Sequence, residues 1–201
     1  MTQSAVRKAL LKQRRALSPR ERQTASDNLA TRVCNTAPFR YSRRLAFYIA
    51  NDGEIDPAMC LDIADACGKQ CFLPVIHPLK FNRLYFARYR RGDALQINRY
   101  GIPEPDLGRA LLIPAWSLDI IFLPLAAFDS QCHRIGMGGG YYDRTLAFKR
   151  RTSRASPLLI GLAYQFQQVD TIIPHAWDIP LNAVITDGDI FISPPRAKLN
   201  H

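Results

Sequence analysis

Hydrophobic positions near the N-terminus recur with the spacing of helices. In residues 2–17, apolar side chains are separated by basic ones and fall on one face of an amphipathic helix. These apolar residues are Val6, Leu10, Leu11 and Leu17. A second helix is predicted to begin at Ser18, because Ser18 suits the N-cap, Pro19 the first helical position and Glu21 the third position of a capping box. This helix is predicted to end at about residue 35.

Beyond the second helix, apolar runs typical of strands alternate with helical and loop segments. Strands are predicted at residues 43–50, 70–76, 84–90, 119–123, 158–163 and 181–186. Helices are predicted at about residues 57–67 and from Tyr142 to the basic residues 149–151, with a short helical turn within 165–170. This alternation predicts an α/β fold with a mainly parallel sheet covered on both faces.

Length and apolar content predict a single domain over residues 1–201. The chain has 201 residues, of which 47% are hydrophobic, enough for a sizeable core. Residues 1–37 are expected to hold the N-terminal helices, and residues 193–201 are expected to form a frayed tail. The N-terminus lacks the apolar segment of a secretory signal, and the most apolar span, 110–128, is broken by two prolines and an aspartate. A cytoplasmic protein without a membrane span is therefore expected.

Five cysteines are present, and no two of them form a C-x-x-C pair. They are Cys34, Cys60, Cys67, Cys71 and Cys132. An odd number without paired spacing argues against a disulfide framework and against a zinc site. Most of them are expected to be buried as small hydrophobic residues.

The most informative stretch is a glycine cluster in the second half of the chain. Four of the eleven glycines lie within five residues: Gly136, Gly138, Gly139 and Gly140. Arg134 precedes the cluster, and Tyr141, Tyr142 and Asp143 follow it. An apolar run at 120–128 lies upstream and the predicted helix lies downstream. The glycines are thus expected in a strand–loop–helix junction.

Such a junction suits a polyphosphate. Without Cβ atoms, the main chain can approach a ligand closely and direct several N–H groups at it. The N-terminal end of the following helix and the Arg134 guanidinium would add positive charge. Asp143 would then lie well placed to coordinate a Mg²⁺ ion that bridges the phosphates. A plain turn is the alternative interpretation. The spacing fits neither the Walker loop nor the dinucleotide-binding fingerprint.

The segment AFDSQCHRIGMGGGYYDRTL, residues 127–146, resembles the signature of the 5-formyltetrahydrofolate cyclo-ligases, also called 5,10-methenyltetrahydrofolate synthetases. Residues 47–57 and 174–186 are also similar to that family, and the N-terminus is similar more weakly. The resemblance covers nearly the whole chain and implies a three-layer α/β/α fold. One departure is Cys132, which stands where the family commonly has a glycine.

The resemblance implies an ATP site built around the glycine loop. The ATP-binding residues would be Arg7, Arg134, Gly136, Met137, Gly138, Gly139, Gly140, Tyr141 and Tyr142. Arg7 aligns with the second member of a basic pair that reaches the phosphates in the family. The first member is Gln3 here, and Lys8 is a candidate to replace it. The alternative for Arg7, Lys8, Lys12, Arg14 and Arg15 is a solvated basic helix face.

The resemblance also implies a folate site and a metal site. The folate-binding residues would be Ile49, Glu54, Tyr100, Met137, Gly138, Gly139, Gly140 and Tyr141. Glu54 would pair with the N–H donors of the pterin, and the alternative interpretation of Glu54 is an exposed loop acid. For Tyr100, the alternative is a tyrosine that simply packs in its loop. Asp143 and Asp178 would hold Mg²⁺. Asp178 lies between Trp177 and Ile179, and its alternative role is that of a loop or cap acid.

The implied reaction is an ATP- and Mg²⁺-dependent cyclisation of 5-formyltetrahydrofolate to 5,10-methenyltetrahydrofolate, with release of ADP and phosphate. It would pass through a phosphorylated formyl group. Arg134 and Tyr142 are the expected catalytic residues, and Tyr141 and Tyr142 are expected to separate the two substrate pockets. No protein nucleophile and no catalytic histidine are required.

The formal charge of +10 leaves other functions open. The basic residues are dispersed, and two anionic substrates, ATP and a polyglutamylated folate, explain the excess as well as a nucleic acid does. The alternatives are a sugar-phosphate enzyme that binds no ATP and a basic nucleic-acid-binding protein. ATP and 5-formyltetrahydrofolate are the expected partners of a monomer, with no membrane or nucleic acid involved.

Overall fold

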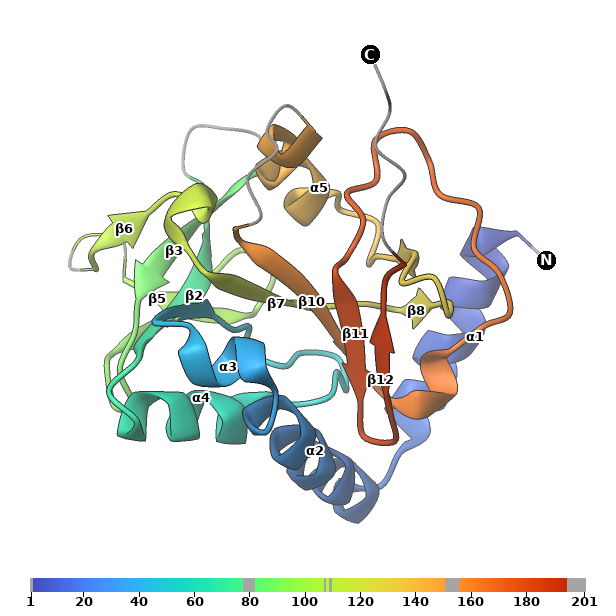
Figure 1. The fold of residues 1–201 in the computed structure, drawn as a ribbon, viewed down its shortest axis with the longest axis horizontal. Coiled ribbons are helices and arrows are strands. Elements are labelled where there is room, and N and C mark those ends of the chain that lie inside the picture. Colours follow the sequence, from blue (N-terminus) through green and yellow to red (C-terminus); the bar gives the residue numbers. More distant parts are fainter. Residues whose placement is uncertain (1, 78–81, 107, 109, 151–155, 195–201) are drawn as a thin grey trace.

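The computed structural model is built on an eight-stranded sheet with the order β12-β11-β10-β7-β1-β2-β3-β6 (Figure 1). Its strands are β1 (Arg44–Ala46), β2 (Gln70–Ile76), β3 (Leu84–Arg88), β6 (Leu112–Ile113), β7 (Ile120–Pro124), β10 (Leu158–Ala163), β11 (Ala183–Thr186) and β12 (Ile190–Ile192). The five central strands from β11 to β2 are parallel to one another. At the edges, β12 pairs antiparallel with β11, β3 pairs antiparallel with β2, and β6 pairs antiparallel with β3. The sheet is therefore mainly parallel, as predicted.

The central strands are apolar because both faces of the sheet are covered. In β7, residues 120–123 are all buried, and in β10 the five residues after Leu158 are buried. A continuous apolar run of this kind is typical of a parallel strand that lies under helices on two sides. The carboxyl ends of the parallel strands all meet at one edge of the sheet, which is where ligands bind in open α/β folds.

Helices form the two outer layers. One face is covered by α2 (Pro19–Cys34), α3 (Ala37–Tyr41) and α4 (Ala58–Ala66), which bury Leu29, Phe39 and Cys60 against the sheet (Figure 1). The other face carries α5 (Tyr141–Thr145) and a 3₁₀ turn at Ala147–Arg150, with Leu146 and Phe148 in the second core cluster. The three-layer α/β/α architecture is confirmed.

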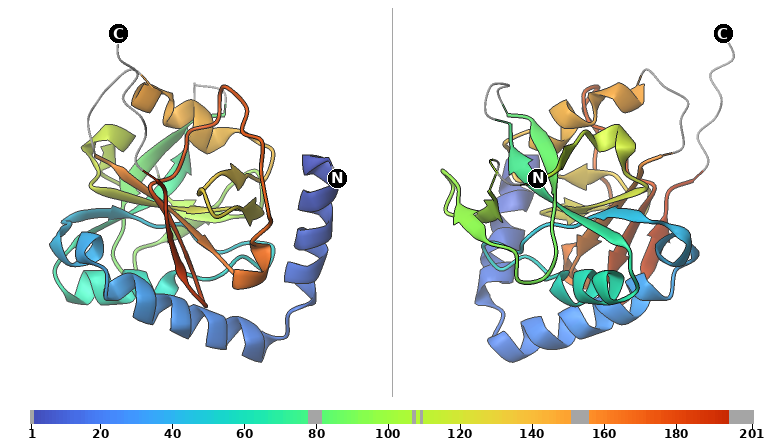
Figure 2. Two further views of the ribbon diagram at one scale, coloured as in Figure 1. Left: turned by 45° about the vertical axis from the view of Figure 1, so that its right-hand side comes forward. Right: turned by 90° about the vertical axis from the view of Figure 1, so that its left-hand side faces the viewer.

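Helix α1 (Gln3–Ala16) lies outside these layers, along one side of the molecule (Figure 2). Its apolar face packs on a two-stranded hairpin formed by β8 (Ala127–Phe128) and β9 (Arg134–Ile135). Val6, Leu10 and Leu11 contact a buried cluster that includes Ala127 and Ile135. The amphipathic pattern of residues 2–17 thus covers the hairpin that leads into the glycine loop.

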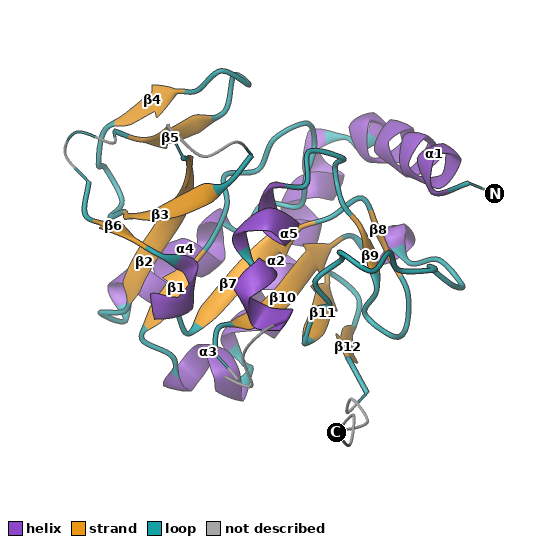
Figure 3. Ribbon diagram, turned by 90° about the horizontal axis from the view of Figure 1, so that it is seen from above, coloured by secondary structure: helices purple, strands orange, loops and turns teal. Residues whose placement is uncertain are grey.

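A second small hairpin lies at the opposite end of the molecule from α1 (Figure 3). It pairs β4 (Leu95–Ile97) with β5 (Pro103–Pro105) and carries the loop that contains Tyr100. Short 3₁₀ helices at Ala115–Ser117 and Gln165–Gln167 complete the regular structure.

Several predicted elements were confirmed and others were wrong. The capping box at Ser18 is present, with the Glu21 carboxylate accepting from the Ser18 N–H. The predicted strand at 43–50 is only three residues long, because the chain leaves the sheet after Ala46. The predicted helix from Tyr142 to 149–151 breaks at residue 146 into α5 and a 3₁₀ turn.

The strand predicted at residues 181–186 is present as β11. It is not the last strand of the chain, because β12 follows it and pairs with it in the antiparallel direction. Strand β12, the β8–β9 hairpin and α3 carry no long periodic pattern, and the sequence did not predict them.

The structure describes residues 2–77, 82–106, 108, 110–150 and 156–194. The predicted frayed tail lies outside the described residues from residue 195 onward, as does Arg151 at the end of the predicted helix. Within the described part, no helix has the length and apolar character that a membrane crossing requires.

Candidate functional site

A cleft of about 1010 Å³ opens at the carboxyl edge of the sheet. It lies between α1, the glycine loop, the Glu54 loop and the β4–β5 hairpin. All of the predicted site residues line it: Arg7, Ile49, Glu54, Tyr100, Arg134, Gly136, Met137, Gly138, Gly139, Gly140, Tyr141, Tyr142, Asp143 and Asp178. Folding thus brings together five segments that are up to 171 positions apart in the sequence.

The glycine loop follows the two-residue strand β9 of a hairpin, and not the buried strand β7 as the sequence suggested. Gly138 and Gly140 have φ angles of 99° and 64°, which favour glycine because a Cβ is strained there. No atom lies within 4 Å of the position that a Cβ on Gly136 would occupy, so the main chain there borders open space. The loop is therefore an open main-chain surface facing the cleft.

The helix after the glycine loop is shorter than expected. Helix α5 has five residues, and its N-cap, Gly140, provides no side-chain cap. A helix this short has a small dipole, so its end contributes less positive potential than the predicted long helix would. Most of the positive potential at the glycine loop therefore comes from the arginines Arg7 and Arg134.

Two arginines flank the glycine loop. Arg7 donates from Nε to the Gly136 carbonyl at 2.9 Å, and its guanidinium lies 3.6 Å from where a Gly138 Cβ would be. Arg134 donates from Nη2 to Oδ1 of Asp143 at 2.5 Å and from Nη1 to the Ile179 carbonyl. Arg134 is largely buried, with 6% of its side chain exposed. The forked guanidinium is thus fixed at the base of the cleft.

Gln3 lines the cleft and donates to the Ile173 carbonyl at 2.8 Å. Lys8 is exposed and does not belong to the lining of the cleft. The structure therefore gives no support to Lys8 as a replacement for the missing lysine of the basic pair.

The two predicted metal ligands lie close together. Oδ1 of Asp143 accepts from the Ile179 N–H at 3.1 Å, and Ile179 follows Asp178 directly. Asp178 is half-buried, and its Oδ2 accepts from the His175 N–H at 2.8 Å, so it does act as a loop cap as well. Within the described residues, no three His, Cys, Asp or Glu side chains gather as a metal cage. Asp143 and Asp178 are the two candidate carboxylates, and Mg²⁺ at a site of this kind is held largely by substrate phosphates and water.

Glu54 lies at the far side of the cleft, with 10% of its side chain exposed. Oε2 accepts from the Asn51 N–H at 3.1 Å. Burial raises the pKa of Glu54 to about 7, while the Asn51 N–H and the Arg14 charge act in the opposite direction. Glu54 is therefore not the exposed loop acid of the alternative interpretation.

Tyr142 is half-buried in the same part of the cleft. Burial and the Glu54 charge raise the pKa of Tyr142 well above its ordinary value, whereas Arg134 lowers it. The Tyr142 hydroxyl thus interacts electrostatically with both the Glu54 carboxylate and the Arg134 guanidinium. Tyr141 lies at the mouth, where its hydroxyl bonds to that of Tyr100 at 2.6 Å. Both tyrosines line the same cleft, and their role in separating the two substrates stays a prediction.

Two features of the site were missed by the sequence. Glu104 is buried at the cleft wall, where its Oε2 accepts from the Ile76 N–H and from Asn98 Nδ2. Arg14 was counted in the solvated basic face, yet it is 1% exposed and lies behind Glu54. In the sequence, Arg14 sits at a helix position that gives no signal of burial, because its partners belong to a loop 38 positions away.

The turn before Arg134 is held by Asp129, which is 1% exposed. Its carboxylate accepts from the N–H groups of Gln131, His133 and Ile172 and from the His133 ring. Cys132 adopts φ 63°, the left-handed conformation that a glycine would favour. The departure at Cys132 therefore leaves the glycine-like turn in place.

The comparisons with known proteins agree with this geometry. Residues 1–187 match the model of the 5-formyltetrahydrofolate cyclo-ligase family. The chain belongs to this family. The 5-formyltetrahydrofolate cyclo-ligases of Escherichia coli strain K12 and of Haemophilus influenzae are each 36% identical to it, covering 89% and 88% of this chain and 96% and 92% of their own. As a member of the 5-formyltetrahydrofolate cyclo-ligase family, the protein is an enzyme of the ligase class.

A solved structure shares the fold. The NMR structure of Aquifex aeolicus 5,10-methenyltetrahydrofolate synthetase superposes with a TM-score of 0.81 at 29% sequence identity, covering 100% of this chain and 97% of that one. The similarity therefore includes the segments that build the cleft as well as the sheet.

Proposed function

We propose that this protein converts 5-formyltetrahydrofolate to 5,10-methenyltetrahydrofolate at the expense of ATP, in the presence of Mg²⁺, with release of ADP and phosphate. The observation that carries the proposal is the single cleft with a cationic main-chain loop at one end and a buried carboxylate at the other. The family and the names of its relatives support the same activity.

The glycine loop end suits the triphosphate of ATP. Arg7 and Arg134 flank a stretch of main chain whose residues Gly136, Gly138, Gly139 and Gly140 carry no side chains of their own. Main-chain N–H groups, together with forked guanidinium donors, recognise phosphate oxygens. Met137, Tyr141 and Tyr142 would complete this end of the cleft.

Asp143 and Asp178 would hold Mg²⁺ beside these phosphates. Their closeness through the Ile179 N–H fits the pair of carboxylates that such a site uses. When bound, the ion neutralises charge on the phosphates and holds them in place.

The opposite end suits a reduced folate. The Glu54 carboxylate can accept from the adjacent N–H groups of the pterin ring, and Ile49 borders the same wall. Tyr100 offers an exposed ring, with 54% of its surface accessible, that can lie against the substrate. Nη1 of Arg14 lies 4.0 Å from the Met137 sulfur and 4.0 Å from Oε1 of Glu54, so the formyl group and the γ-phosphate would meet where Met137, the loop glycines and Tyr141 approach the folate end.

In this reaction the formyl oxygen of the folate, a poor leaving group, is first phosphorylated so that it can leave as phosphate. The N5-formyl oxygen of the folate attacks the γ-phosphorus, an O–P bond forms, and the bond to the bridging oxygen breaks, so ADP leaves with the electron pair. The resulting N5 iminium carries a phosphorylated oxygen. N10 adds to its carbon, the C–O bond breaks with departure of phosphate, and N10 gives up its proton to the released phosphate or to water.

The protein contributes mainly by positioning the substrates and by compensating charge. The buried Arg134 guanidinium would stabilise the charge that develops on the transferred phosphoryl group. Tyr142, between Arg134 and Glu54, would hold the reacting groups of the two substrates in line. ATP as the second substrate is consistent with a cytoplasmic location.

The test is an absorbance assay for the methenyl product, with phosphate release measured in parallel. Product is expected only when the purified protein meets folinate, Mg²⁺ and ATP together. Phosphate release that ignores folinate would instead favour a different phosphate-binding enzyme. Salt-dependent binding of short RNA or DNA, without any reaction of folinate, would favour the nucleic-acid alternative.

A further inference from the structure

Arg14 is a charged residue in a place where charge is costly. It is 1% exposed, although Lys8, Lys12 and Arg15 of the same helix are exposed. A guanidinium stays protonated in proteins, so it cannot avoid the cost of burial by losing its proton. Burial of a charge persists where close partners compensate it. The partners of Arg14 therefore indicate what it is for.

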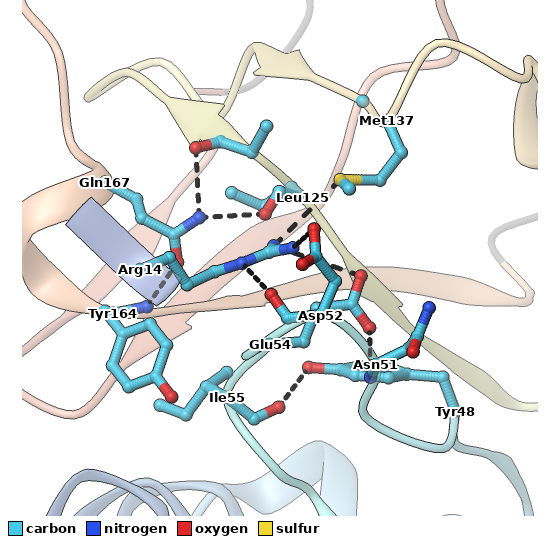
Figure 4. Close-up of polar contacts among 12 residues, drawn as sticks. Arg14, Tyr48, Asn51, Asp52, Glu54, Ile55, Leu125, Met137, Tyr164 and Gln167 are labelled. Atoms are coloured by element: carbon cyan, nitrogen blue, oxygen red, sulfur yellow. Dashed lines mark hydrogen bonds and ion pairs between the residues drawn. The ribbon is translucent and has the colours of Figure 1, made fainter. Parts of the chain in front are cut away.

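Those partners belong to the loop that carries Glu54 (Figure 4). Nε of Arg14 donates to the Asp52 carbonyl at 3.1 Å, and Nη2 donates to Oδ2 of Asp52 at 3.4 Å. Nη1 lies 4.0 Å from Oε1 of Glu54 and 4.0 Å from the sulfur of Met137. A single buried side chain thus contacts both the Glu54 loop and the glycine loop.

Asp52 does not by itself account for Arg14. Its carboxylate already has a closer cation in Arg15, whose Nε and Nη2 donate to Oδ1 and Oδ2 at 2.6 and 2.8 Å. Arg15 is 61% exposed and pairs with Asp52 from the solvent side. The more buried Arg14 lies on the inner side, between this pair and Glu54.

The loop between these groups is shaped to face the cleft. Asp52 and Gly53 have φ angles of 51° and 75°, so the chain reverses immediately before Glu54. A Cβ on Gly53 would lie 3.2 Å from the Arg14 carbonyl, which shows how closely the loop and α1 pack. The direction of the Glu54 side chain is thereby tied to α1.

The groups around Glu54 balance one another. Arg14 faces it from α1, Asp52 from its own loop, Tyr48 from the segment after β1, and Tyr142 from α5. Among these, Arg14 is the cation that favours the ionised carboxylate, whereas burial and Asp52 disfavour it. With Arg14 in place the pKa of Glu54 is about 7, so loss of Arg14 would shift the balance further towards the protonated acid.

We propose that Arg14 is a positioning residue, which holds the Glu54 carboxylate directed into the cleft so that it can accept a pair of N–H donors from a heteroaromatic ring. The inference rests on the proposed function, in which that ring is the pterin of the folate substrate. Arg14 touches neither substrate in this arrangement and acts through Glu54.

The test compares Arg14→Met with Arg15→Met, since the two arginines share Asp52 but only Arg14 reaches Glu54. Arg14→Met is expected to raise the folinate KM about tenfold at pH 7 with a smaller effect on kcat. The pH at which the folinate KM begins to decrease should also shift upwards in this variant. Arg15→Met is expected to keep the wild-type KM and pH dependence. A folded Arg14→Met protein with the folinate KM and pH profile of the wild type would overturn the proposal.

Arg14→Lys covers the case in which the methionine variant does not fold. It keeps the charge and is expected to retain the wild-type pH dependence, with a folinate KM raised about threefold because the forked contacts to Asp52 are lost. A wild-type KM in this variant would count against positioning by Arg14.

A second readout does not depend on activity. The titration of Glu54 can be followed by ¹³C NMR of the side-chain carboxyls, with the Glu54→Gln protein used for assignment. Arg14→Met should move that titration towards higher pH, whereas Arg14→Lys, which keeps the charge, should leave it close to that of the wild type. An unchanged titration in an active enzyme overturns this inference alone, whereas a wild-type protein that leaves folinate unchanged overturns the proposed function.

Discussion

Arg134 and Asp143 form an ion pair at the base of the cleft, with Nη2 of Arg134 2.5 Å from Oδ1 of Asp143. The same carboxylate oxygen accepts from the Ile179 N–H at 3.1 Å. One carboxylate thus orients the arginine next to the glycine loop and fixes the loop that carries Asp178. The proposed phosphate and metal groups are therefore coupled before any ligand is present.

Removal of the Arg134 guanidinium should slow the reaction strongly. For Arg134→Ala we expect kcat/KM to fall by about 2–4 kcal/mol of transition-state stabilisation, or roughly 30- to 1000-fold, the scale of losing one preorganised donor. Steady-state kinetics with folinate and Mg·ATP measure it. Arg32→Ala is a suitable control, since Arg32 lies outside the lining of the cleft and donates to the Gly188 carbonyl at 2.7 Å. Turnover near that of the wild type would remove Arg134 from the mechanism.

Loss of charge at Asp143 should raise the Mg²⁺ concentration that the enzyme requires. Asp143→Asn keeps the shape of the side chain but provides a weaker ligand for Mg²⁺. We expect the Mg²⁺ concentration for half-maximal rate to rise several-fold, and a titration of rate against free Mg²⁺ tests this. Superimposable titrations for variant and wild type would exclude Asp143 as a metal ligand.

Glu54 should make the folded protein less stable as pH rises. Its folded pKa of about 7 lies above the ordinary value of 4.5, so between these values the folded state binds the proton that the unfolded state has lost. The free energy of unfolding therefore falls across pH 4.5–7, and the loss is complete above about pH 7. Glu54→Gln removes this effect.

We expect Glu54→Gln to be more stable than the wild type at pH 8 by about 3 kcal/mol, taking about 1.4 kcal/mol for each pKa unit, and nearly equal to it at pH 4.5. Denaturant unfolding at the two pH values measures the difference. Equal stability of the two proteins at pH 8 would contradict the raised pKa.

Asp129 should matter for folding more than for chemistry. Its buried carboxylate accepts from three main-chain N–H groups and from His133, so Asp129→Ala would leave several buried donors unpaired. We expect a loss of about 3 kcal/mol in the free energy of unfolding, measured by chemical denaturation. Asp129→Asn, which keeps an acceptor oxygen, should lose less. An Asp129→Ala protein as stable as the wild type would show that the turn does not depend on this carboxylate.

Tyr100 should act through its ring rather than through its hydroxyl. The ring meets Tyr141 edge-on at 5.9 Å between centroids, and the two hydroxyls bond at 2.6 Å. We expect Tyr100→Ala to raise the folinate KM about tenfold, whereas Tyr100→Phe should raise it less than threefold, because an exposed hydrogen bond contributes only about 1 kcal/mol. Similar KM values for the two variants would place the contribution in the hydroxyl instead.

Much of the fold and of the cleft could be predicted from local pattern. The apolar runs of β7 and β10 identified buried parallel strands, and Ser18 with Glu21 identified the start of α2, because these signals depend on residues close in the sequence. The composition of residues 134–143 likewise predicted a phosphate-binding loop, and every predicted site residue lines one cleft. Their roles in binding ATP, folate and Mg²⁺ stay predictions.

Only the tertiary structure decided which charges are buried and which partners they have. Arg14 and Arg15 are neighbours of the same type in one helix, yet 1% of one side chain and 61% of the other is exposed, because a loop 38 positions later covers only Arg14. The raised pKa of Glu54 and the contact of Arg134 with the Ile179 carbonyl, 45 positions away, depend on the same kind of long-range packing. Sequence pattern fixes periodicity and local geometry, whereas desolvation and charge pairing arise when distant segments meet.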